Sequence, residues 1–176
     1  MPLEEMRFES VFEQRYDYSC GIASVSSLVS LYWGYPATED ELLNLFLPAD
    51  ERKPRENITM HDLQIVLEQM GFAAGGFMLT YDQLLRAAAA YGPLIVHLEE
   101  GEGHFALFIG EAGGFTVTAD PSLGCLASNT DEFARSWSNT ALAAYHPDSK
   151  LDAGAVSRAI SVTANRVETL RLWTLQ

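Results

Sequence analysis

Cys20 stands where a thiol gains nucleophilic character. It follows residues 14–19 (QRYDYS) and comes directly before a stretch whose apolar residues recur at helical spacing. The sequence therefore predicts Cys20 at a helix N-terminus, where a partial positive charge of about half a unit favours the thiolate and lowers the pKa of the thiol. A structural cysteine would more naturally lie in the middle of a helix, among apolar neighbours. Cys20 is accordingly the candidate nucleophile.

A cysteine nucleophile needs a base, and the chain contains four histidines. His61 lies at a predicted helix start, His146 lies beside a proline in a predicted loop, and His97 lies within an apolar strand where it can face either side. His104 follows the sequence Gly-Glu-Gly and begins another apolar strand. Its ring is expected at the rim of a sheet, where a substrate can reach it, so His104 is the candidate base.

Asp120 ends the next predicted strand after His104 and is followed by Pro121. An Asp-Pro pair by itself is more often a turn that ends a strand. The two strands are joined by a short Gly-containing turn, however, and predict an antiparallel hairpin, in which the start of one strand lies beside the end of the other. We therefore expect Asp120 beside His104, where its carboxylate can fix the tautomer of the imidazole.

Gln14 is a fourth candidate because it precedes Cys20 by six residues. A side-chain amide at that place, together with the backbone N–H of Cys20, can form an oxyanion hole. A glutamine alone is uninformative, since most glutamines lie on the surface. The interpretation of Gln14 depends on its spacing from Cys20 along the chain.

The elements that must position these residues change from helices to strands along the chain. Apolar periodicity and end signals predict helices over residues 21–33, 38–47, 59–70 and 80–91, with Thr38 and Thr59 as caps. Short strands are predicted over residues 72–79, 94–98, 104–109, 115–119 and 141–145, with one helix, 130–137, among them. A run of helices followed by a run of strands indicates an α+β domain.

The composition is that of an acidic globular protein. The 176 residues fit one domain, with 48% apolar and 20% charged residues. The net charge of −13 and the lack of a Lys/Arg stripe argue against a nucleic acid or an anionic membrane as partner. The one basic cluster, residues 52–55, is flanked by glutamates and is interpreted as a solvated loop. No apolar run approaches the ~18 residues of a membrane span, so an integral membrane protein is not expected.

Cysteine count and the N-terminus bear on compartment and cofactors. Cys20 and Cys125 are too few for a disulfide framework, although a single bridge between them stays open at this point. The N-terminus lacks the features of a signal peptide, so we expect a cytoplasmic protein, or a periplasmic one if the chain is a mature form without its leader. The sequence shows neither metal-ligand spacing nor a Gly-rich phosphate loop, so neither a metal nor a cofactor is expected.

Four short motifs together resemble the double-glycine leader peptidases, a family of papain-like cysteine proteases. They are Gln14 six residues before Cys20-Gly21, Gly103-His104-Phe105, Asp120-Pro121 with Gly124, and Asp131-Glu132-Phe133 followed by Trp137. The first motif is most similar to the stand-alone branch of the family. The resemblance covers residues 7–146 and implies a papain-like fold, with N-terminal helices packed on a C-terminal antiparallel sheet. It leaves residues 147–176 as a C-terminal extension that is predicted to be helical.

The resemblance also implies a role for each candidate residue. Cys20 becomes the nucleophile, His104 the general base and acid, Asp120 the orienting carboxylate and Gln14 the oxyanion donor. The implied substrates are secreted peptides or protein precursors whose helical leader ends in a Gly-Gly-type pair, and an ABC transporter or a secretion channel is an implied partner. Ser19 departs from the transporter-fused members, which usually carry an acidic residue there, and this difference bears on leader specificity.

Two other functions fit parts of the pattern. A transglutaminase-like acyl transferase shares the order Cys, His, Asp, but the spacing of Gln14 suits the peptidase. A non-catalytic domain could instead bind leader peptides and pass them to a secretion system, with the acidic face or the tail as its dock. Residues 149–176 carry a charge of +2 within a chain of net charge −13. The simpler interpretation of this tail is a terminal helix that packs on its own acidic domain.

Overall fold

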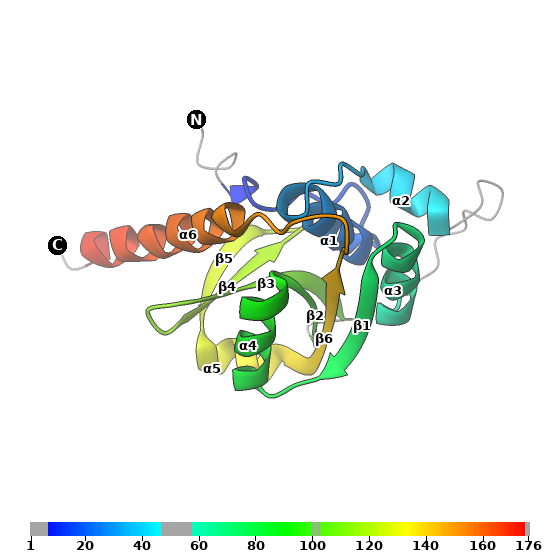
Figure 1. Cartoon of the computed structure of the whole chain (residues 1–176). Helices are drawn as coiled ribbons and strands as arrows, with labels where there is room; N and C mark the ends of the chain where they lie inside the picture. Colours follow the sequence, from blue (N-terminus) through cyan, green and yellow to red (C-terminus); the bar gives the residue numbers. More distant parts are fainter. Residues whose placement is uncertain (1–6, 47–57, 100, 102, 175–176) are drawn as a thin grey trace.

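One antiparallel sheet forms the centre of the molecule, and helices cover both of its faces (Figure 1). The computed structural model describes residues 7–46, 58–99, 101 and 103–174, so the predicted loop with the basic cluster lies outside the described residues. Six strands in this part of the chain follow the order β1-β6-β2-β3-β4-β5 across the sheet. The predicted α+β class is confirmed.

Three helices come first in the chain: α1 (Cys20–Ser27), α2 (Glu39–Phe46) and α3 (Met60–Gln69). The prediction of one regular helix over residues 21–33 is wrong in its second half, because α1 continues as a short π-helix, η2 (Leu28–Tyr32). The Ser27 hydroxyl donates to the carbonyl of Ala23 at 2.7 Å, and the Ser30 hydroxyl donates to that of Ala37 at 3.2 Å. Hydroxyls that bond the backbone in this way compete with regular helix geometry.

Threonine caps set the starts of α2 and α3, as the sequence predicted for Thr38 and Thr59. The Thr38 hydroxyl accepts the N–H of Glu41 at 3.3 Å, and the Glu41 carboxylate returns to the N–H of Thr38 at 2.7 Å. Thr59 forms the same reciprocal pair with Asp62 in front of α3. Each capping box satisfies two backbone donors that would otherwise lack partners, which fixes the residue at which the helix begins.

The strands follow from residue 73 onward, with two helices between them. Their bounds are β1 (Ala73–Met78), α4 (Tyr81–Tyr91), β2 (Leu94–Leu98), β3 (His104–Ala112), β4 (Phe115–Asp120), β5 (Gly124–Asn129), α5 (Thr130–Ser136) and β6 (Trp137–Tyr145). Strand β5 was not predicted, because its sequence GCLASN has no β-branched or aromatic residue. It forms by pairing with β4, for example Cys125 with Ala119. Strand β6 begins at Trp137, four residues before the predicted start.

The two faces of the sheet pack against different helices. On one face, alternate residues such as Ile95, Phe105 and Leu107 join a core with α1 and α3. On the other face, their neighbours Val96 and Phe108 pack with residues of α4 and α5. This alternation is the period-2 pattern of a strand that is buried on both faces. On the first of these faces α1 packs against β3, and these two elements carry the candidate nucleophile and base.

The last helix, α6 (Ala153–Thr174), packs on the domain with its first half (Figure 1). Ala159 and Thr163 are buried, and Ile160 lies so close to Gly110 of β3 that a Cβ there would be 2.9 Å from its Cδ1. The tail is thus helical and docks on its own chain, as the simpler interpretation predicted. The domain boundary at residue 146 stays a prediction. None of the described helices is long and apolar enough to span a bilayer.

Candidate active site

Cys20 is the first residue of α1, as the sequence predicted. The residue before it, Ser19, is fully buried and turns its hydroxyl back to the preceding loop. That hydroxyl donates to the carbonyl of Tyr16 at 2.8 Å and accepts the N–H of Tyr16 at 3.3 Å. The chain therefore enters the helix at Cys20, and the thiol lies beside the free N–H groups of the first turn.

Strands β3 and β4 form the predicted hairpin and bring His104 to Asp120. Leu107 pairs with Ala119 in the antiparallel ladder, and the Nε2 of His104 lies 2.9 Å from the Oδ2 of Asp120. The His104 side chain is 20% exposed and that of Asp120 only 6%. The carboxylate is thus sheltered from water, while the imidazole can still be reached by a substrate.

The turn after β4 holds the Asp120 carboxylate in place. Its Oδ1 accepts the backbone N–H of Ser122 at 2.7 Å and that of Leu123 at 3.2 Å. Oδ2 lies beside His104, so one oxygen binds the backbone of the turn and the other contacts the imidazole. A carboxylate fixed in this way can hold the imidazole in one orientation and one tautomer.

Cys20 and His104 share a hydrogen bond, and each shifts the pKa of the other. Burial raises the pKa of the Cys20 thiol, but the hydrogen bond with His104 and those from the backbone N–H groups of Phe105 and Gly21 favour the thiolate and leave the pKa below its ordinary value. Burial lowers the pKa of His104, whereas hydrogen bonds with Asp120 and Cys20 raise it to about 10. This arrangement can hold a thiolate–imidazolium pair at neutral pH.

Gln14 joins the same site through the turn after β4. Its backbone N–H donates to the carbonyl of Pro121 at 2.9 Å, and its Oε1 accepts the hydroxyl of Ser122 at 2.8 Å. Its Nε2 donates to the carbonyl of Tyr16 at 3.0 Å, which leaves one hydrogen of the amide for another acceptor. The structure thus connects Gln14 with the Asp120 turn. Its role as oxyanion donor stays a prediction.

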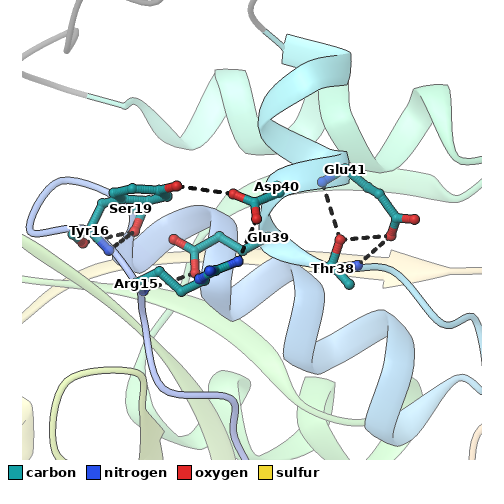
Figure 2. Close-up of polar contacts among 7 residues, drawn as sticks. All are labelled: Arg15, Tyr16, Ser19, Thr38, Glu39, Asp40 and Glu41. Atoms are coloured by element: carbon teal, nitrogen blue, oxygen red, sulfur yellow. Dashed lines mark hydrogen bonds and ion pairs between the residues drawn. The ribbon is translucent and has the colours of Figure 1, made fainter.

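Helix α2 anchors the loop between Gln14 and Cys20 (Figure 2). The buried carboxylate of Glu39 accepts the backbone N–H of Arg15 at 3.0 Å. Asp40 pairs with the Arg15 guanidinium and accepts the hydroxyl of Tyr16 at 3.1 Å. Sequence reasoning explained the acidic first turn of α2 by the helix dipole alone and missed this contact. The three consecutive carboxylates after a threonine cap gave no sign of which one would turn inward.

His61, His146 and the second cysteine lie away from the site, whereas His97 on β2 contacts Phe105, the residue after His104. His61 is exposed on α3, and His146 is buried, with its Nδ1 accepting the N–H of Asp148 at 3.2 Å. Cys125 is buried in β5, and both cysteines are free, so the structure contains no bridge between Cys20 and Cys125. Among the residues that the structure describes, no group of three or more His, Cys, Asp or Glu side chains could hold a metal ion.

Comparison with known proteins identifies the family. The model of the Peptidase C39 family matches residues 9–149. The "Probable functional amyloid protease FapD" of Pseudomonas aeruginosa is 30% identical over 144 residues, and that of Pseudomonas fluorescens is 28% identical. Each match covers 80% of this chain and 62% of the relative, so the chain spans less than two thirds of these relatives.

Solved structures show the same fold at low sequence identity. The peptidase domain of Streptococcus ComA, a bifunctional ABC transporter of a quorum-sensing pathway, superposes with a TM-score of 0.68 at 18% identity, over 78% of this chain and 98% of that domain. A double-glycine-motif protease from an AMS/PCAT transporter, solved with its leader peptide, gives 0.53 at 18% identity, over 76% and 89%. The predicted papain-like fold is confirmed. The chain belongs to the Peptidase C39 family.

Proposed function

We propose that this chain is a cysteine peptidase that cleaves a peptide or protein precursor directly after a leader that ends in a Gly-Gly-type pair. Cys20 is the nucleophile, His104 the base and acid, Asp120 the orienting carboxylate and Gln14 the oxyanion donor. The observation that carries the proposal is that Nε2 of His104 lies 2.9 Å from Oδ2 of Asp120, while the interaction of His104 with Cys20 lowers the pKa of the thiol.

The reaction follows from these contacts. The Cys20 thiolate attacks the carbonyl carbon of the last leader residue, and the oxyanion is held by the Cys20 backbone N–H and the free hydrogen of the Gln14 amide. The His104 imidazolium donates its proton to the leaving amine, and a thioester remains on Cys20. His104 then removes a proton from water, the hydroxide attacks the thioester, and the leader leaves with a free carboxylate as Cys20 regains its thiolate and His104 its proton.

The choice of a leader substrate rests on the relatives and on the motifs. One similar structure is a double-glycine-motif protease bound to a leader peptide, and another is the peptidase domain of an ABC transporter. The spacing of Gln14, Cys20, His104 and Asp120 supports the same activity here. We also propose an ABC transporter or a secretion channel as partner. Since two relatives are named probable functional amyloid proteases, functional amyloid proteins are a second substrate set to test.

Cleavage of a synthetic leader peptide tests the proposal. Wild type is incubated with a helical leader that ends in Gly-Gly before a short cargo, and the products are identified by mass spectrometry. Cys20→Ala and His104→Ala should abolish cleavage, and Cys125→Ala, a matched change of a free cysteine away from His104, should retain it. Undiminished cleavage by Cys20→Ala would overturn the assignment. Amine incorporation would support the acyl transferase instead, and leader binding without cleavage would support the binding domain.

A further inference from the structure

Ser19, the residue directly before the nucleophile, is buried and does not use its hydroxyl as a helix cap. Serine is favoured in front of a helix because its hydroxyl commonly accepts an N–H of the first turn. Within the described residues, the Ser19 hydroxyl caps none of the N–H groups of α1. It turns back along the chain, where it donates to the carbonyl of Tyr16 at 2.8 Å and accepts the N–H of Tyr16 at 3.3 Å. Since Ser19 is 0% exposed, it has no surface with which to contact a leader.

The carbonyl of Tyr16 connects Ser19 to Gln14. It accepts the Ser19 hydroxyl at 2.8 Å, the Ser19 N–H at 3.2 Å and the Nε2 of Gln14 at 3.0 Å. A carbonyl oxygen only accepts hydrogen bonds, so the end of the Gln14 amide that faces it is Nε2. One hydrogen of Nε2 is bound there. Because the amide group is planar, the position of the Tyr16 carbonyl determines where the second hydrogen points, and that hydrogen is the proposed oxyanion donor.

The Tyr16 peptide group lies in an exposed loop, where burial contributes little to the conformation. Residues 15–18 are all exposed. Helix α2 contacts the backbone N–H of Arg15 and the hydroxyl of Tyr16, whereas the Ser19 hydroxyl binds both the backbone N–H and the carbonyl of Tyr16 (Figure 2). The direction of the Tyr16 carbonyl therefore depends on the Ser19 hydroxyl.

We propose that Ser19 is a positioning residue that aims the Gln14 amide at the oxyanion. The inference rests on the proposed function, in which Gln14 is the oxyanion donor, and adds the residue that orients this donor. Without the hydroxyl, the Tyr16 carbonyl keeps one hydrogen bond from Ser19 in place of two, so it can turn and the Gln14 amide turns with it. The thiolate is favoured by His104 and by backbone N–H groups. Ser19 thus acts on the oxyanion and leaves the nucleophile unchanged.

Kinetics with two substrates separate this role from a merely structural one. Ser19→Ala should lower kcat for a Gly-Gly leader about tenfold with KM nearly unchanged, because a misplaced donor costs less than the ~100-fold of a missing one. Alkylation of Cys20 by iodoacetamide forms no oxyanion and depends on the thiolate, so its rate should stay within about twofold of wild type. A disturbed fold would lower both rates. Ser19→Thr keeps a hydroxyl and should restore kcat. Ser26→Ala is the matched control, since Ser26 is a buried serine of α1 whose hydroxyl donates to the carbonyl of Ala37.

A double-mutant cycle with a peptide aldehyde separates this inference from leader cleavage. The Cys20 thiolate adds to the aldehyde carbon of a Gly-Gly aldehyde, and the electron pair of the C=O bond moves to the oxygen, where the proposed donors hold it. Ser19→Ala should weaken this adduct in the wild-type background and add little in Gln14→Ala, because both changes remove the same interaction. That result supports the role of Ser19 even if no leader is cleaved. Equal effects of Ser19→Ala in the two backgrounds, or unchanged aldehyde binding, overturn it even if leaders are cleaved.

Discussion

The Ser122 hydroxyl donates to the Oε1 of Gln14 at 2.8 Å and so fixes which end of the amide faces the nucleophile loop. The backbone N–H of the same Ser122 donates to Asp120 at 2.7 Å. One residue of the turn after β4 therefore positions both the orienting carboxylate and the proposed oxyanion donor. Since neither hydrogen bond involves Cys20 or His104, Ser122 can be changed without removing a reacting group.

Ser122→Ala should lower kcat by about fivefold with KM nearly unchanged. The change removes the hydroxyl that orients Gln14 and keeps the backbone N–H that binds Asp120, and a hydrogen bond of this kind contributes about 1 kcal/mol. The effect falls on kcat because the oxyanion forms only in the transition state. Steady-state kinetics on the leader peptide measure it. Ser157→Ala, at an exposed position of α6, is the matched control, and equal kcat in both variants would contradict the role given to Gln14.

Cys20 should be alkylated by iodoacetamide much faster than Cys125 at pH 6. The pKa of Cys20 is lowered by its hydrogen bonds despite burial, so a larger fraction is thiolate at low pH, whereas burial raises the pKa of Cys125. Removing His104 takes away a group that favours the thiolate. His104→Ala should therefore move the pH at which Cys20 reaches half its maximal rate upward. Mass spectrometry of each cysteine gives both profiles, and a Cys20 profile that does not move in His104→Ala would refute the ion pair.

Asp120→Asn should shift the alkaline limb of kcat/KM to lower pH. His104 must be protonated to donate to the leaving amine, so activity falls as pH rises through its pKa, which is about 10 in the free enzyme. The asparagine removes the charge, and its NH2 group takes the place of the Oδ2 that faces His104, so the pKa of His104 falls towards the ordinary 6.5. The maximal rate should also fall about 100-fold or more. Asp131→Asn, in the first turn of α5, is the control, and an unshifted limb in Asp120→Asn would contradict the assignment.

Gly21→Ala should destabilise the protein and reduce activity. A Cβ at this position would lie 3.0 Å from both methyl carbons of Leu63 on α3 and 3.2 Å from the Phe105 ring. Relief of this overpacking costs about 1–3 kcal/mol and shifts the residue next to Cys20. Thermal unfolding and leader cleavage measure the two effects. Adding Leu63→Val makes room on one side, so the double variant should be more stable than the sum of the two changes predicts, and strict additivity would show that the contact is not strained.

The sequence was sufficient for residues whose position follows from a local pattern. The periodicity after Cys20 predicted the helix that it begins, and the short turn between two apolar strands predicted that His104 meets Asp120. Strand β5 was missed because its six residues lack β propensity and pair only through contact with β4. The inward turn of Glu39 was missed for a related reason. It depends on a backbone donor, Arg15, that is 24 residues away and that no periodic pattern marks.

Glu39→Ala should lower kcat about tenfold, while Glu39→Gln should remain within about threefold of wild type. The Glu39 side chain is buried, and its Oε2 is the acceptor for the Arg15 N–H in the loop that carries Gln14 and Cys20. Alanine removes the acceptor of the Arg15 N–H, a hydrogen bond that contributes about 1 kcal/mol, and releases the loop from α2. Glutamine keeps a carbonyl oxygen at the same place, so rescue by Glu39→Gln shows that the acceptor is needed rather than the charge.

Asp40→Ala is the control, because its partners Arg15 and Tyr16 are exposed and an exposed ion pair contributes little. If Glu39→Ala lowers thermal stability but leaves kcat equal to that of Asp40→Ala, Glu39 does not hold the loop in the arrangement that catalysis needs.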